Sequence, residues 1–148
     1  MIIYLDSSAI IKRYIDEAGT SAVNSLFAET NGIGTNLVAR AEVAAGLMRA
    51  ARINIISRDD ALSALEKLRS EWENYQRLSV TEATVFRADD LVIKYDLRGY
   101  DAIHLAAAVI WQEVIGETIT LATFDQKLWV AANEYGMHAW PDEDTIIA

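Results

Sequence analysis

Two runs of uncharged, mostly apolar residues constrain the fold of this chain more than any other feature. IIYL (2–5) is a continuous apolar run and TITLAT (118–123) is rich in β-branched residues, and neither contains a charged residue. Strands that read as continuous apolar runs are typical of parallel sheets, which are covered by helices on both faces. Most segments between the apolar runs carry apolar residues every three or four positions, which predicts helices.

The order of these patterns predicts an α/β protein. We expect strands at 2–5, 32–35, 77–80, 118–123 and 137–140, and helices at 7–15, 20–29, 37–52, 58–75, 82–95, 101–115 and 124–135. Ser7 or Ser8, Asn36 and Thr81 are suitable N-caps, because a short polar side chain accepts a hydrogen bond from the first helical turn. Alternating strands and helices predict a three-layer α/β/α sandwich with a mainly parallel central sheet. At 148 residues, and with one proline and no linker-like tract, residues 1–148 should form a single domain.

Composition narrows the class of protein. The net charge is −9, which argues against simple coating of nucleic acid. The acidity is uneven, since residues 1–58 hold six Lys or Arg against five acids and residues 59–148 hold seven against seventeen. The chain has no cysteine, which excludes disulfides and thiolate metal sites. No apolar stretch has the length of a membrane span and the N-terminus lacks a signal-peptide pattern, so we expect a cytoplasmic protein without membrane contact.

Four acids stand where the predicted elements begin or end. Asp6 directly follows the first strand, Asp125 follows the strand at 118–123, Asp101 begins an almost apolar helix, and Glu42 lies among alanines near a helix start. Each acid alone has an ordinary explanation, such as a favourable interaction with a helix dipole or simple exposure. If the four converge, however, their mutual repulsion requires a cation. Oxygen ligands of this kind suit Mg²⁺.

The segments around these acids resemble a known family. YLDSSAIIKRY, NLVARAEVAAGL, RGYDAIHLAAA and LATFDQKL occur in the order and local context of the PIN domain, and the resemblance to VapC-type toxins of toxin–antitoxin pairs spans essentially the whole chain. It implies an α/β/α sandwich and a Mg²⁺- or Mn²⁺-dependent endoribonuclease. It also implies a homodimer and a small antitoxin protein whose C-terminal segment blocks the active site.

The resemblance assigns roles to individual residues. Asp6, Glu42, Asp101 and Asp125 match the family's acidic quartet, while Thr123 and Ser7 lie where hydroxyls orient those carboxylates. Asp6 and Asp101 are the first choices as direct metal ligands, and Glu42 and Asp125 would act through water or accept a proton. The segment between Asp101 and Asp125 is longer than in compact relatives. The substrate would be single-stranded or looped RNA, whose nucleotides can be splayed into a cleft.

Several assignments have alternatives. Arg49, Lys12 and Arg13 are candidates for RNA contact, although each also fits a plain surface cation. His104 is more typical of a hydrogen-bonded core residue than of a metal ligand. A non-catalytic PIN-fold binding module is one alternative function. A phosphoaspartate phosphatase or receiver is another, but Ser8 stands where such phosphatases need a second Asp.

Overall fold

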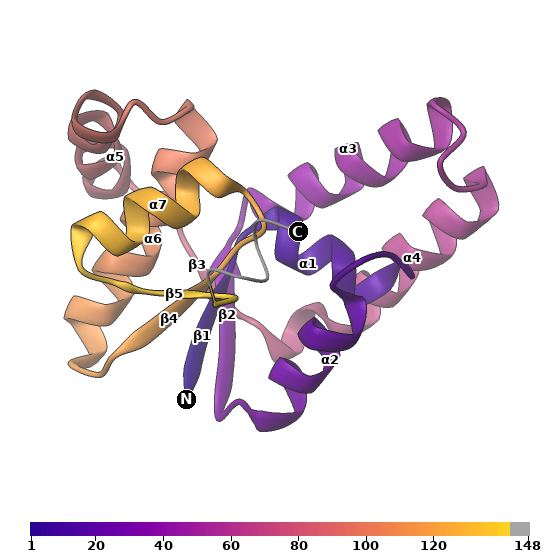
Figure 1. Ribbon diagram of the computed structural model, residues 1–148, viewed down its shortest axis with the longest axis horizontal. Helices are drawn as coiled ribbons and strands as arrows, with labels where there is room; N and C mark the ends of the chain where they lie inside the picture. Colours follow the sequence, from indigo (N-terminus) through magenta and orange to yellow (C-terminus); the bar gives the residue numbers. More distant parts are fainter. Residues whose placement is uncertain (143–148) are drawn as a thin grey trace.

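The centre of the computed structural model is a five-stranded sheet in the order β3-β2-β1-β4-β5, in which every neighbouring pair is parallel (Figure 1). The structure describes residues 1–142. The strands are β1 (Ile2–Leu5), β2 (Gly32–Asn36), β3 (Gln76–Leu78), β4 (Ile119–Ala122) and β5 (His138–Trp140). The helices are α1 (Ser7–Tyr14), α2 (Thr20–Glu29), α3 (Ala39–Arg52), α4 (Arg58–Glu71), α5 (Glu82–Tyr95), α6 (Gly99–Ile115) and α7 (Gln126–Tyr135). The predicted α/β sandwich with a parallel sheet is therefore confirmed.

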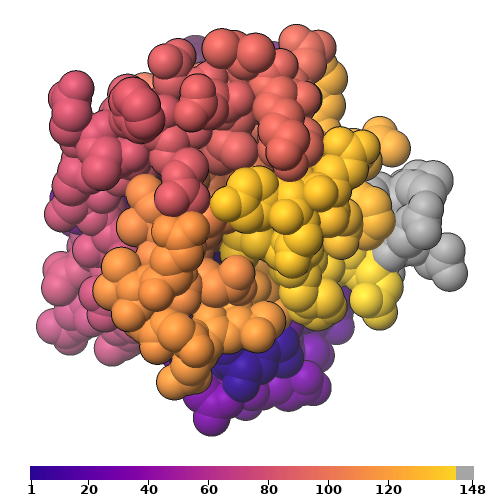
Figure 2. Space-filling view, turned by 90° about the vertical axis from the view of Figure 1, so that its left-hand side faces the viewer, coloured from indigo at the N-terminus to yellow at the C-terminus, as the bar shows by residue number. Residues whose placement is uncertain are grey.

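The helices form two layers, one on each face of the sheet. Helices α1 to α4 cover one face and α5 to α7 cover the other (Figure 1). Figure 2 views the molecule from the side of the second layer, where residues of α5, α6 and α7 form most of the visible surface. Each layer buries its own apolar cluster against the sheet. The sheet is thus buried on both sides, which explains why its three inner strands, β2, β1 and β4, contain no charged residue.

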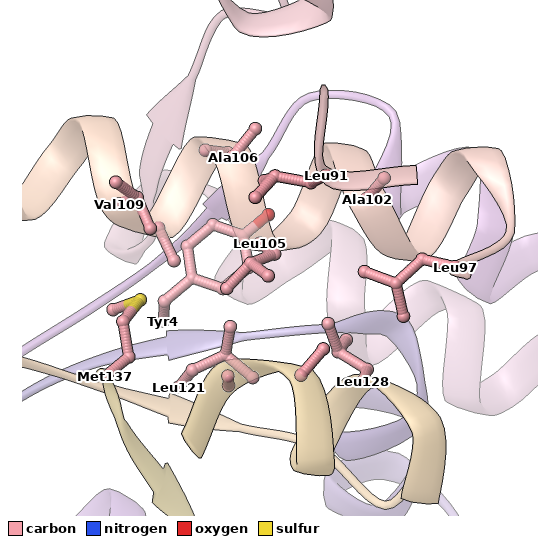
Figure 3. Packing of buried hydrophobic residues seen from close by; sticks show 14 of the residues in the cluster. Tyr4, Leu91, Leu97, Ala102, Leu105, Ala106, Val109, Leu121, Leu128 and Met137 are labelled. Carbon is pink, nitrogen blue, oxygen red and sulfur yellow. The ribbon is translucent and has the colours of Figure 1, made fainter. Parts of the chain in front are cut away.

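Strand β1 supplies both clusters, because successive side chains of a strand point to opposite faces. Ile3 and Leu5 enter the cluster beneath α1, α3 and α4. Tyr4 enters the opposite cluster, where it lies among Leu91, Leu105 and other apolar side chains (Figure 3). Tyr4 therefore carries a phenolic hydroxyl deep into an otherwise apolar layer.

The ends of several elements differ from the sequence prediction. The helix predicted over 58–75 ends at Glu71 and tightens into a 3₁₀ turn over Trp72–Asn74. This turn leads directly into β3, which covers Gln76–Leu78 instead of 77–80. The helix predicted to begin at 101 starts two residues earlier, at Gly99. Boundaries shift in this way because tertiary packing decides where a helix stops, whereas the apolar pattern only locates its middle.

The helix caps were partly predicted. Thr81 caps α5 as expected, and Thr81 and Thr84 form a reciprocal capping box. The prediction that Ser7 or Ser8 caps α1 is wrong, because the Asp6 carboxylate accepts the hydrogen bond from the Ala9 backbone N–H at 2.9 Å. Helix α3 starts at Ala39, later than expected, and Val38 directly before it offers no side-chain cap, but the predicted cap Asn36 does accept a hydrogen bond from the Ala39 N–H at 3.0 Å.

No helix in the described part of the chain is both long enough and apolar enough to cross a membrane.

Candidate active site

The register of the sheet places three polar residues at one edge. Leu5 aligns with Ala122 across the β1–β4 pair, and Tyr4 aligns with Gly34 across the β1–β2 pair. Consequently Asp6, just beyond β1, lies level with Asn36 at the end of β2 and with Thr123 just beyond β4. The Asp6 backbone N–H donates to the carbonyl of Ala122 at 3.1 Å and extends the pairing by one residue. This is the carboxyl edge, where ligands bind in open α/β sheets.

Four helices begin near this edge, and each carries one of the predicted acids at its start. Asp6 caps α1, and Asp125 caps α7 by accepting a hydrogen bond from the Leu128 N–H at 2.9 Å. Glu42 and Asp101 lie in the first turns of α3 and α6. The positive end of a helix stabilises a carboxylate, which partly offsets the repulsion among the four acids. All four line one cavity of about 550 Å³.

Asp6 is the most deeply placed of these acids, with 3% of its surface exposed. Burial raises the pKa of its carboxyl, because desolvation disfavours the charged form. Hydrogen bonds donated by Thr123 and, at 2.7 Å, by Ser8 favour the charged form and oppose this effect. Ser8 rather than the predicted Ser7 supplies the hydroxyl bonded to Asp6, while Ser7 lines the cavity. The Asp6 carboxylate is therefore held in one orientation from three sides.

Arg98 joins two of the acids across the mouth of the cavity. Its Nε donates to Asp101 Oδ2 at 3.1 Å and its Nη2 donates to Asp125 Oδ2 at 2.8 Å. Burial and the neighbouring charge of Asp125 raise the pKa of Asp101, and Arg98 opposes that shift. Arg98 was not among the residues predicted from the sequence. Its position three residues before Asp101, at the start of the same helix, is the signal that points to such a contact.

The fourth acid is held by a histidine. Nε2 of His104 lies 2.8 Å from Oε1 of Glu42, and only 1% of the His104 surface is exposed. His104 is thus the hydrogen-bonded core residue that the sequence predicted. The sequence did not indicate that its partner would be Glu42, because the two residues are 62 positions apart on different helices.

The three predicted RNA-contacting cations do not line the cavity. Lys12 forms an ion pair with Glu17 at 3.0 Å, and Arg13 donates to Asn24 at 2.8 Å. Arg49 is exposed on α3. Their contact with RNA stays a prediction.

The chemistry of the cavity suits a hard divalent cation, since its charged acceptors are carboxylate oxygens. Within residues 1–142 no three Asp, Glu or His side chains stand together as a ready-made metal cluster. Instead, the Arg98 guanidinium provides the positive charge between Asp101 and Asp125. Arg98 therefore supplies, between Asp101 and Asp125, positive charge of the kind that a bound metal ion would bring.

Comparison with known proteins identifies the family. The model of the PIN domain matches residues 3–133 of the chain. The chain belongs to the PIN domain family. Curated relatives of this PIN domain include Ribonuclease VapC46 of Mycobacterium tuberculosis, 31% identical over 135 residues that cover 91% of this chain and 93% of the relative. Ribonuclease VapC3 of Pyrobaculum aerophilum is 30% identical over 123 residues, which cover 82% of this chain and 89% of the relative.

Solved structures show the same fold. FitAcB from Neisseria gonorrhoeae matches with a TM-score of 0.67 and 17% identity over 94% of this PIN domain and 96% of that chain. VapBC2 from Rickettsia felis, bound to a DNA fragment from its promoter, matches with a TM-score of 0.61 and 14% identity over 95% and 100% of the two chains. At these identities the likeness concerns the fold alone.

Proposed function

We propose that this PIN domain is a divalent-metal-dependent endoribonuclease and the toxin of a toxin–antitoxin pair. The observation that carries the proposal is the convergence of Asp6, Glu42, Asp101 and Asp125 on one cavity at the carboxyl edge of the sheet. The ribonuclease names of relatives that span most of the chain support RNA as the substrate.

Asp6 and Asp101 would hold Mg²⁺ or Mn²⁺ directly, with Glu42 and Asp125 acting through water. When bound, the ion supplies Lewis-acid stabilisation of a phosphodiester and a more acidic water. Ser8 and Thr123 fix the orientation of Asp6, so that the ligand geometry is set before the ion arrives. Glu42 or Asp125 would accept a proton from the attacking water.

Arg98 would change partners during this process. Its side chain is 75% exposed, so it is free to swing from the carboxylates to a phosphate of the RNA. Guanidinium groups bind carboxylate and phosphate with the same planar set of donors. Single-stranded or looped RNA remains the proposed substrate, since its backbone can enter an open cavity next to Arg98.

The proposal includes two protein partners. A small antitoxin would cover the cavity, and a second copy of the chain would complete a homodimer in the cytoplasm. The similar structures include a toxin–antitoxin complex from Klebsiella pneumoniae and VapBC-5, a member of the VapBC family of toxin–antitoxin systems from Mycobacterium tuberculosis, and this supports the first partner. The contact of Arg98 with two acids shows that a guanidinium fits between them, so that a basic side chain of an antitoxin would find a complementary site.

Substitution of Asp6 by Asn tests the proposal. Asparagine is a good N-cap and keeps an oxygen for the Ala9 N–H, so Asp6→Asn should fold normally. We expect purified wild-type protein to cleave single-stranded RNA with Mg²⁺ or Mn²⁺ and not with EDTA, and Asp6→Asn to lose this activity. Asp90→Asn, an exposed acid on α5, is the matched control and should cleave normally. Equal cleavage by wild type and a clean preparation of Asp6→Asn would refute the proposal.

A further inference from the structure

We propose that His104 is a positioning residue that holds the Glu42 carboxylate through a single, fixed ring tautomer. This inference deepens the proposed function and rests on it, because it assumes that Glu42 serves the metal site. The His104 side chain runs from the apolar layer beneath α5, α6 and α7 to the wall of the cavity. On its inner side Nδ1 lies 2.8 Å from the Tyr4 hydroxyl, and on its outer side Nε2 lies 2.8 Å from Glu42 Oε1.

The side-chain amide of Asn36 has one orientation. Its Oδ1 accepts a hydrogen bond from the Ala39 backbone N–H at 3.0 Å, so the other end of the amide must be the NH₂ group. That NH₂ group donates to the Tyr4 hydroxyl oxygen at 2.9 Å and also lies 3.2 Å from Nδ1 of His104. The start of α3 thus determines which way the Asn36 amide faces.

The Tyr4 hydroxyl both accepts and donates a hydrogen bond. Because the Tyr4 oxygen accepts from Asn36, the one hydroxyl proton of Tyr4 points to Nδ1 of His104. Nδ1 is therefore an acceptor, and in the neutral ring the proton must be on Nε2. Nε2–H then donates to Glu42 Oε1. With this tautomer every donor in the hydrogen-bond network has an acceptor. With the proton of the neutral ring on Nδ1 instead, the Tyr4 hydroxyl would lose its acceptor.

The network links four elements of the fold to one acid. Tyr4 is on β1, Asn36 on β2, His104 on α6 and Glu42 on α3. Tyr4, Asn36 and His104 are each at most 1% exposed, whereas the Glu42 side chain is 21% exposed at the cavity. The hydrogen bond uses Oε1 and leaves Oε2 available to a ligand in the cavity. Buried partners that orient metal-site carboxylates and histidines typically affect metal affinity or activity by about 10- to 100-fold.

Two substitutions of His104 separate positioning from packing. In His104→Gln the side-chain amide reaches the place of Nε2 and retains a donor for Glu42, but the contact with Tyr4 is lost. In His104→Asn the amide reaches only the place of Nδ1 and retains an acceptor for Tyr4, but the donor for Glu42 is lost. Both variants remove the ring, so that both should lower the melting temperature.

The readouts are Mn²⁺ affinity by calorimetry, and kcat and KM on a single-stranded RNA. We expect His104→Gln to stay within about threefold of wild type in Mn²⁺ affinity and kcat, and His104→Asn to lose about 10- to 100-fold, with KM little changed in both. The proposal would be overturned if the losses in Mn²⁺ affinity and kcat matched the fall in melting temperature and did not depend on whether the variant keeps a donor for Glu42. Unchanged affinity and kcat in His104→Asn would do the same.

A measurement on the wild-type chain covers the case in which neither variant folds. Nitrogen-15 NMR of histidine-labelled, metal-free protein should show the His104 proton on Nε2 alone, and Glu42→Gln should shift that signal. A proton on Nδ1, or an equal mixture of tautomers, contradicts the proposal. This result is independent of nuclease activity, so failure of the Asp6→Asn test would refute the proposed function without deciding the His104 tautomer.

Discussion

Replacement of Arg98 by alanine should strengthen binding of a divalent ion and weaken binding of RNA. Arg98 offsets part of the negative charge of Asp101 and Asp125 through contacts of 3.1 and 2.8 Å. A metal ion at these carboxylates must displace the guanidinium or tolerate its charge. Either way, the wild-type protein loses part of the binding free energy of the ion.

The size of the effect follows from the exposure of the side chain. Arg98 is 75% exposed, so water and salt screen both of its ion pairs. Exposed ion pairs contribute about 0.2–1 kcal/mol each, so that removal of both should raise Mn²⁺ affinity by roughly 2- to 30-fold, which corresponds to about 0.4–2 kcal/mol. For RNA we expect the opposite sign, a higher KM, because the side chain proposed to contact phosphate is gone.

The assay is isothermal titration of metal-free protein with Mn²⁺, followed by cleavage kinetics at saturating Mn²⁺. Arg87→Ala is the control, since Arg87 pairs with Glu113 at 3.1 Å and neither residue lines the cavity. The control should leave both quantities unchanged. Mn²⁺ affinity in Arg98→Ala that is equal to or lower than wild type would refute the competition between Arg98 and the metal.

Two further predictions concern the stability of the fold. Gly34→Ala should lower the free energy of unfolding by about 1–3 kcal/mol, because an added Cβ would lie 2.6 Å from the Trp111 ring. Gly32→Ala on the same strand is the control, since its Cβ would meet no atom within 4 Å. Urea denaturation should find this control nearly neutral. Burial raises the pKa of Tyr75 to about 12, so the neutral phenol contributes stability that is complete below pH 10 and is lost as the pH rises to 12. Tyr75→Phe should flatten this alkaline loss of stability in melting curves measured across pH, whereas Tyr100→Phe, at an exposed position, should leave it unchanged. Equal alkaline loss in wild type, Tyr75→Phe and Tyr100→Phe would contradict the assignment.

The sequence predicts the sheet well because its signals are local. The runs at 2–5 and 118–123 contain β1, buried except for Ile2, and β4, buried throughout, for the reason inferred, namely burial on both faces. Strand β3 was placed less accurately, since its residues Gln76 and Arg77 are exposed and leave little apolar pattern. Edge strands of this kind are located by their neighbour in the sheet, which a single sequence does not reveal.

The site was predictable as a set of acids but not as a network. Asp6 and Asp125 follow strands, so their shared edge can be inferred from parallel pairing alone. The partners of these acids come from far along the chain, as with Thr123 and Asp6, which are 117 positions apart. Contacts of Arg98 with Asp125 and of His104 with Glu42 depend in the same way on how helices pack. Sequence spacing carries no information about such distances.

The central claim is that the four carboxylates capture divalent metal at the end of β1. Anomalous diffraction at the manganese edge, from crystals soaked in MnCl₂, tests it most directly. We expect a peak in the cavity within coordination distance of Asp6 and Asp101, close to the roughly 2.0–2.1 Å that is typical of Mg²⁺ and oxygen, and no peak in crystals of Asp6→Asn. A peak only at other surface carboxylates, or the same peak in Asp6→Asn, would contradict it.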